Sequence, residues 1–140
     1  MTATTFPATA GLGLLLIRLM LGAVFLFHGS QKLFGAFGGP GLEGFATFLG
    51  SLDVPLPQVS AVAAALAEFV GGAALVTGFL MRPLCLPLGF TMLVAAFSAH
   101  AGKFSAQDGG MEYPLTLAVV VLGLALTGPG PQALGARRAA

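Results

Sequence analysis

The chain of 140 residues has few charged side chains, a single cysteine and no tryptophan. Charged residues make up 8% of the sequence, whereas a soluble globular protein carries about 25%. Too few ionisable side chains are present to cover the surface of a water-soluble protein of this length. Hydrophobic residues make up 56%, which excludes a disordered chain, because disordered segments are polar. The composition therefore indicates an integral membrane protein.

Two further scarcities exclude other classes of function. The net charge is only +1, so no basic surface is available to neutralise phosphates, and we expect no nucleic-acid partner. Cys85 is the single cysteine, so the chain cannot form an internal disulfide or cycle a dithiol by itself. Any thiol or sulfur chemistry would have to be completed by another subunit.

Four apolar segments are long enough to cross about 30 Å of hydrocarbon as helices. They cover residues of about 11–34, 58–81, 83–100 and 112–127, and the last segment is short. Pro83 and Pro114 suit the first turn of a helix, and the breakers of residues 128–131 end the fourth segment. The sequence therefore predicts a single all-α domain over residues 1–140, an integral membrane four-helix bundle in contact with the lipid bilayer.

The first connection, residues 35–57, is longer than usual for a helix bundle. Within it, one helical stripe carries the apolar residues Leu42, Phe45, Leu49 and Leu52. This pattern predicts a short helix lying in the membrane interface, in the first outer loop. A loop packed over the bundle is the alternative.

The positions of the cations predict the orientation. With four spans, both termini share a side with Arg82, Arg137 and Arg138, while Lys32 and Lys103 lie on the other side. The positive-inside rule then favours cytoplasmic termini in a multi-pass protein of the cell membrane.

Two ionisable residues fall within the apolar segments, where they are expensive and normally face protein or a cavity. Arg18 shares a stripe of the first segment with small glycines, and Glu68 lies at the centre of a face of alanines and glycines. Both are near the middle of the membrane, so we expect Arg18 and Glu68 to form a buried polar pair. Such a pair is either a structural clasp between two helices or a proton- or ligand-binding site.

A second polar cluster lies where the spans meet the outer surface. His28 and Lys32 close the first span, His100 closes the third, and Glu112 opens the fourth. Histidine and lysine can donate hydrogen bonds to quinone carbonyls, and a carboxylate can pass protons. Two histidines could instead bind a haem iron, and capping of helix ends is the structural alternative. Only Glu112 could add a further metal ligand, so we predict no metal site.

Three motifs of the chain resemble those of the DoxX family of small membrane proteins. They read R-x3-G-x2-F-x2-H-G-x2-K-L-F-G over 18–35, A-x2-E-x2-G-G-x2-L-x2-G over 65–78 and G-G-M-E-Y-P-L over 109–115, with Arg82 at the start of the third span. The resemblance covers residues of about 12–127 and implies a membrane-embedded helical bundle. Its motif polar positions are Arg18, His28, Lys32, Glu68, Arg82 and Glu112. His100 lies outside these motifs, so its role depends on its predicted placement.

The resemblance also implies a function. Members of the family are linked to thiosulfate:quinone oxidoreductase, as a small membrane subunit, and to thiol-redox and oxidative-stress complexes. The prediction is a non-autonomous subunit of a membrane oxidoreductase with redox partner proteins and a bound quinone, which we favour over haem.

Two alternatives stay open from the sequence. The first is a non-catalytic scaffold that docks a partner through its small-residue faces or the helix near Leu42 and Phe45. The second is a transporter of a small solute, which would need a homodimer through a face such as Ala61, Ala65 and Gly72.

Overall fold

The computed structural model describes residues 7–134 and is entirely helical over that range. Its α-helices are α1 (Ala8–Phe34), α2 (Gly41–Ser51), α3 (Pro57–Thr77), α4 (Met81–Phe97) and α5 (Glu112–Thr127), with single turns of 3₁₀-helix η1 (Ala36–Gly38) and η2 (Ala106–Asp108). The all-α prediction is confirmed, and each apolar segment predicted from the sequence forms a helix with bounds within a few residues. The number of membrane spans stays a prediction.

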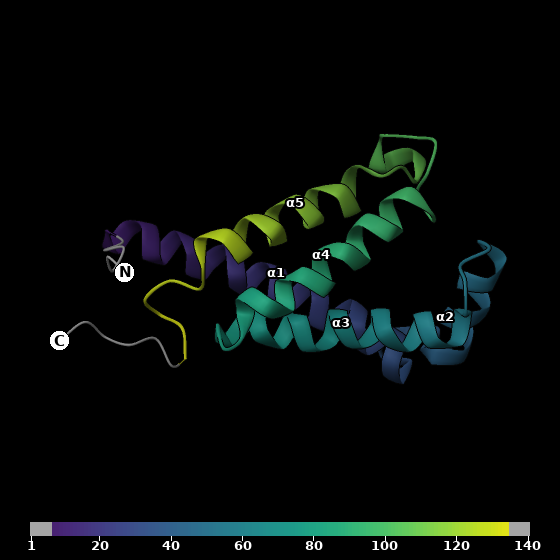
Figure 1. The fold of residues 1–140 in the computed structure, drawn as a ribbon, viewed down its shortest axis with the longest axis horizontal. Helices are drawn as coiled ribbons and strands as arrows, with labels where there is room; N and C mark the ends of the chain where they lie inside the picture. The colour runs from purple at the N-terminus through teal and green to yellow at the C-terminus, as the bar shows by residue number, and fades with distance from the viewer. Residues whose placement is uncertain (1–6, 135–140) are drawn as a thin grey trace.

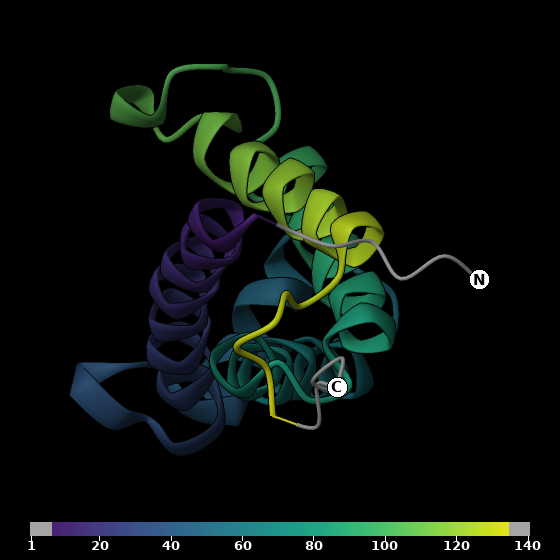
Figure 2. The ribbon, with the colours of Figure 1, turned by 90° about the vertical axis from the view of Figure 1, so that its left-hand side faces the viewer.

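The helices form two antiparallel pairs (Figures 1 and 2). α1 packs along α3, α4 packs along α5, and α3 joins the pairs by its contact with α4. The end of α1, the short helix α2 and the connection between α4 and α5 lie at one end of the molecule, at the right in Figure 1. We call this the α2 end. The start of α1, the turn from α3 to α4 and the end of α5 lie at the opposite end.

Glycines allow α1 and α3 to approach each other closely. A Cβ added at Gly29 would lie 2.6 Å from the backbone nitrogen of Phe69, and one at Gly72 would lie 2.8 Å from that of Leu26. Backbones can come this near only where side chains are absent. The small-residue face of α3 is thus used inside the chain: Ala61 and Ala65 are buried, and Gly72 meets α1. This face is not available to a second copy, so it cannot be the homodimer interface, and a homodimer through another surface stays a prediction.

The exposed side chains are largely apolar. α1 and α3 are long and apolar enough to cross a membrane, and α4 and α5 are apolar helices of 17 and 16 residues. Phe90 is 68% exposed and Leu126 84% exposed. Large apolar surfaces of this kind mark contact with lipid or protein rather than with water.

The predicted short helix in the first connection exists as α2, whose ends lie one residue from those of the stripe that runs from Leu42 to Leu52. Its apolar stripe faces inward, since Phe45 and Leu49 are buried with Ala46 and Ala61. A partner therefore cannot dock on Phe45, and that part of the scaffold alternative is wrong. The position of α2 at a membrane interface stays a prediction.

Candidate functional site

The buried Arg18 is bound entirely by backbone carbonyls. Its Nε donates to the oxygen of Leu75 at 2.9 Å, Nη2 to Val76 at 3.1 Å and Nη1 to Pro129 at 2.5 Å. Leu75 and Val76 belong to the last turn of α3, whose carbonyls have no donors within the helix. The guanidinium supplies those donors, and its positive charge suits the negative end of the helix dipole. Arg18 thus joins α1, α3 and the segment after α5.

The predicted pair of Arg18 with Glu68 is wrong. Glu68 precedes Leu75 by seven residues, which is about 10 Å along α3. The unsatisfied carbonyls at the end of α3 are therefore nearer to Arg18 than the carboxylate is. Both side chains are buried, as predicted, but Arg18 makes its contacts near one end of the bundle and Glu68 makes its contact nearer the α2 end.

Glu68 is instead paired with Lys32, from the last turn of α1. Lys32 Nζ lies 2.5 Å from Glu68 Oε1, and it also lies 5.0 Å from the centre of the Phe45 ring. The Glu68 side chain is 1% exposed and that of Lys32 23% exposed. Among the described residues, Glu68 Oε2 has no hydrogen-bond partner. A buried carboxylate oxygen without a donor is costly, so this atom is ready to accept a proton or a hydrogen bond.

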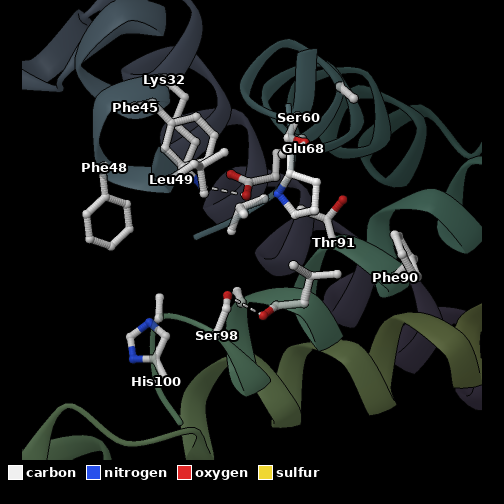
Figure 3. A pocket seen from close by; sticks show the side chains of 17 residues that line it. Lys32, Phe45, Phe48, Leu49, Ser60, Glu68, Phe90, Thr91, Ser98 and His100 are labelled. Atoms are coloured by element: carbon white, nitrogen blue, oxygen red, sulfur yellow. Dashed lines mark hydrogen bonds and ion pairs between the residues drawn. The ribbon is translucent and has the colours of Figure 1, made fainter. Parts of the chain in front are cut away.

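A cavity of about 590 Å³ lies beside this ion pair (Figure 3). Glu68 and Lys32 lie on one wall and His100 on another. The cavity is lined by the end of α1, by α2, α3 and α4, and by the connections that follow α2 and α4. Its remaining lining is mostly apolar, with Ser60, Thr91 and Ser98 as further polar positions and Phe45, Phe48, Leu49 and Phe90 among the large side chains. Phe48 and Phe90 are exposed, so the cavity reaches the apolar outside of the molecule.

A second, smaller cavity of about 150 Å³ shares the same acid. It is lined from α1 by Phe25, His28 and Lys32, from α3 by Glu68, from α4 and its following turn by Met92, Ala95 and His100, and from α5 by Tyr113, Pro114 and Leu117. Glu68, Lys32 and His100 line both cavities. The carboxylate therefore lines both cavities, and in the smaller one it shares the lining with the titratable side chains of His28, Lys32, His100 and Tyr113.

The predicted ligand residues do not all line the same cavity. Lys32 and His100 line the larger cavity, whereas His28 lines only the smaller one. His28 Nδ1 lies 3.2 Å from Gln31 Oε1, and His100 Nδ1 lies 2.9 Å from the carbonyl oxygen of Gly109.

Two motif residues lie away from both cavities. Glu112 accepts a hydrogen bond from the backbone nitrogen of Ala106 at 2.9 Å, which holds the connection between α4 and α5. Arg82 begins α4 and reaches the carbonyl of Thr127, at the end of α5, at 3.5 Å. These contacts are structural.

Tyr113 was not identified as a site residue from the sequence. It is the single tyrosine of the chain and follows Glu112 directly, within the G-G-M-E-Y-P-L motif, which was the available signal. The serines and the threonine of the larger cavity carried no signal, because hydroxyl side chains are common in apolar helices and usually bond to their own backbone. Thr91 does so with Pro87, and Ser98 with Val94.

Metal binding finds no support in residues 7–134. No group of three or more histidine, cysteine, aspartate or glutamate side chains lies close enough together there to hold an ion. Cys85 is buried in α4 and is not part of either cavity.

The fold and the site together define a class: an all-helical membrane protein with a buried acid–lysine pair between two cavities. The family model of DoxX matches residues 13–101, which is more than half of the chain. The chain therefore belongs to the DoxX family.

The chain is also similar to two bacterial proteins over most of their length. The chain is 28% identical to the "Inner membrane protein YphA" of Escherichia coli (strain K12) over 138 residues, 94% of each chain. It is 30% identical to the "Putative oxidoreductase CatD" of Bacillus subtilis (strain 168) over 118 residues, 84% of this chain and 80% of that protein. No solved structure matches the chain. The family and the first relative support a location in the membrane.

Proposed function

We propose that this protein binds a quinone in the larger cavity and serves as the membrane subunit of a redox complex. The observation that carries the proposal is the unpartnered Oε2 of Glu68, held beside Lys32 at the wall of an apolar chamber. The name of the relative CatD as an oxidoreductase supports a redox role.

The cavity suits such a ligand in size and in lining. Its volume of about 590 Å³ falls within the range of about 300–1,000 Å³ typical of small-molecule sites. Apolar walls with a few polar groups match a ring with two carbonyls and an apolar tail. The exposed Phe48 and Phe90 give that tail a route to the lipid.

Each polar group has a distinct part in the chemistry. Reduction of a quinone to a quinol takes two electrons and two protons. Lys32 can donate a hydrogen bond to one carbonyl oxygen, and His100, whose Nδ1 faces the Gly109 carbonyl, can donate from Nε2 to the other when it is protonated. Glu68 and the protonated His100 can then deliver the two protons. The electrons would come from a redox partner protein, which this subunit would link to the membrane quinone.

We further propose four membrane spans, with the α2 end on the outer side. The predicted cytoplasmic side carries Arg82, and it also carries Arg137 and Arg138, which lie outside the described residues. On the other side Lys32 is drawn into the bundle by Glu68, so Lys103 is the cation left on the surface at that end. This distribution agrees with the positive-inside rule.

The test uses tryptophan as a reporter, because the chain has none. Phe90→Trp places one fluorophore at the cavity, and Phe79→Trp places a matched one at the opposite end of the bundle. In detergent micelles titrated with decylubiquinone, we expect saturable quenching for Phe90→Trp. For Phe79→Trp we expect only the linear quenching of quinone dissolved in the micelle.

Removal of the acid tests the assignment. Glu68→Gln in the Phe90→Trp background keeps the size of the side chain but breaks the ion pair, and we expect at least tenfold weaker binding, about 1.4 kcal/mol. Glu43→Gln, the same change on the exposed face of α2, is the matched control and should bind as the parent does. Linear quenching at both reporter positions, or equal affinity of Glu68→Gln and Glu43→Gln, would contradict the proposal.

A further inference from the structure

Glu68 lines two cavities that lead in different directions. The larger one is apolar and reaches the lipid side through Phe90. The smaller one leads toward the α2 end, where His28 and His100 are half-buried and Tyr113 is 48% exposed. A proton that enters or leaves the buried carboxylate therefore has a route through the smaller cavity, lined by His28, His100 and Tyr113, of which only His100 also lines the ligand chamber.

We propose that Glu68 exchanges its proton with the aqueous side at the α2 end through the smaller cavity, past His28 and His100. The inference deepens the proposed function, because it separates the entry of the proton from the entry of the ligand. It also stands on its own geometry: a carboxyl that is 1% exposed has one oxygen without a partner among the described residues, and it lines a cavity together with His28, His100 and Tyr113.

The size and lining of the smaller cavity suit proton transfer. At about 30 Å³ for each water molecule, 150 Å³ holds roughly five of them. Histidine changes its protonation near neutral pH and is therefore suited to pass protons between a buried acid and bulk water. Two histidines from different elements flank the route, so each can serve when the other is replaced.

The titratable groups that face Glu68 come from three of the surrounding elements. α1 contributes Lys32 and His28, the turn after α4 contributes His100, and α5 contributes Tyr113. From α2 the cavity walls carry only apolar side chains such as Phe45. Lys32 binds Oε1, which leaves Oε2 as the carboxyl oxygen without a partner among the described residues.

Dicyclohexylcarbodiimide measures the protonation of the acid directly. This lipid-soluble reagent adds to a protonated carboxyl: the carboxyl oxygen bonds to the carbodiimide carbon, the proton moves to nitrogen, and rearrangement gives a stable N-acylurea with no atom lost. The mass of the intact purified protein then rises by that of the reagent. Absence of the adduct in Glu68→Gln assigns the labelled site.

The experiment compares right-side-out and inverted membrane vesicles that carry the full chain. The pH is varied on one side while the other side is buffered. Gln107→Cys, in the Cys85→Ala background and labelled by an impermeant maleimide, reports which side of the vesicle membrane holds the α2 end. We expect the labelled fraction of Glu68 to rise as the pH falls on the α2 side and to stay constant when the pH is changed on the other side.

The histidines are tested as a pair. In the double variant His28→Leu, His100→Leu, we expect the response of labelling to pH on the α2 side to fall at least tenfold. Glu112→Gln, at the same end but outside both cavities, should keep the native response. The infrared carbonyl band of a protonated carboxyl, absent in Glu68→Gln, checks in native membranes that the acid titrates in each variant.

Several results would overturn the inference: labelling that follows the pH of the opposite side, a native response in the double-histidine variant, or no pH-dependent Glu68 signal by either method. No quinone is used. A protein that fails to bind quinone but titrates from the α2 side would therefore refute the proposed function and leave this inference standing.

Discussion

Replacing Gly29 by alanine should separate α1 from α3 and loosen the site. The added Cβ would lie 2.6 Å from the nitrogen and 2.8 Å from the Cα of Phe69, both backbone atoms that no rotamer change can move. An ordinary contact needs about 3.4 Å or more, so the helices must part by several tenths of an ångström. Phe69 follows Glu68 directly, and Lys32 is one turn from Gly29, so the displacement falls on the ion pair.

The magnitude follows from a matched pair of variants. Gly13 lies on the same helix with nothing within 4 Å of an added Cβ. Alanine at either position gains the same helix propensity, about 1 kcal/mol. Gly29→Ala also carries an overpacking cost of about 1–3 kcal/mol, which Gly13→Ala does not. The two variants should therefore differ by about 1–3 kcal/mol, with Gly29→Ala the less stable.

Equilibrium unfolding by sodium dodecyl sulfate in mixed micelles, followed by circular dichroism, measures this difference. We also expect Gly29→Ala to bind decylubiquinone more weakly than Gly13→Ala in the Phe90→Trp background. Equal stability of the two variants would refute the close packing of α1 on α3 and with it the geometry that brings Lys32 to Glu68.

Two further predictions concern the opposite end of the bundle. Arg18→Met should destabilise the protein by about 2–5 kcal/mol in the same unfolding assay, because one buried and two part-buried carbonyls lose their donors; a loss below 1 kcal/mol would show that the carbonyls find other partners. Gly78→Ala should cost more than Gly102→Ala: both glycines have positive φ, of 79° and 87°, but only at Gly78 does an added Cβ meet Ala133, while Gly102 has open space. Equal midpoints for these two alanine variants would contradict the contact at Gly78.

The helices were predictable because the signals for them are local. Apolar runs, prolines in first turns and glycines after last turns act within one helix, and the predicted bounds of about 11–34 and 112–127 lie close to α1 and α5. Gly35 and Gly78 both end helices in the left-handed conformation. The burial of Arg18 and Glu68 was predictable for the same reason, since a charge inside an apolar run must face protein.

The partners of these charges were not predictable. Their positions along the helices predicted that Arg18 and Glu68 both lie near the middle of the membrane. Glu68 is, however, about 10 Å along α3 from Leu75, whose carbonyl binds Arg18, and this distance prevents the pair. Arg18 donates to backbone carbonyls at the end of α3. Every residue type has such a carbonyl, so the sequence gives no signal for this contact. Lys32 was expected at the outer surface, yet its long side chain follows the helix inward to the acid.

The sequence by itself determined that this protein is all-helical, apolar on its outside and a member of the DoxX family, and that it has two buried charged residues. Composition, periodicity and motifs are properties of the chain, so they can be read without the tertiary structure. The tertiary structure alone decided that Lys32 neutralises Glu68, that Arg18 binds backbone, and that one carboxylate faces two cavities. Those facts depend on how closely α1, α3 and α4 pack and on how far they are offset along the axis of the bundle. Contacts between helices determine both quantities, and no pattern within a single helix reveals them.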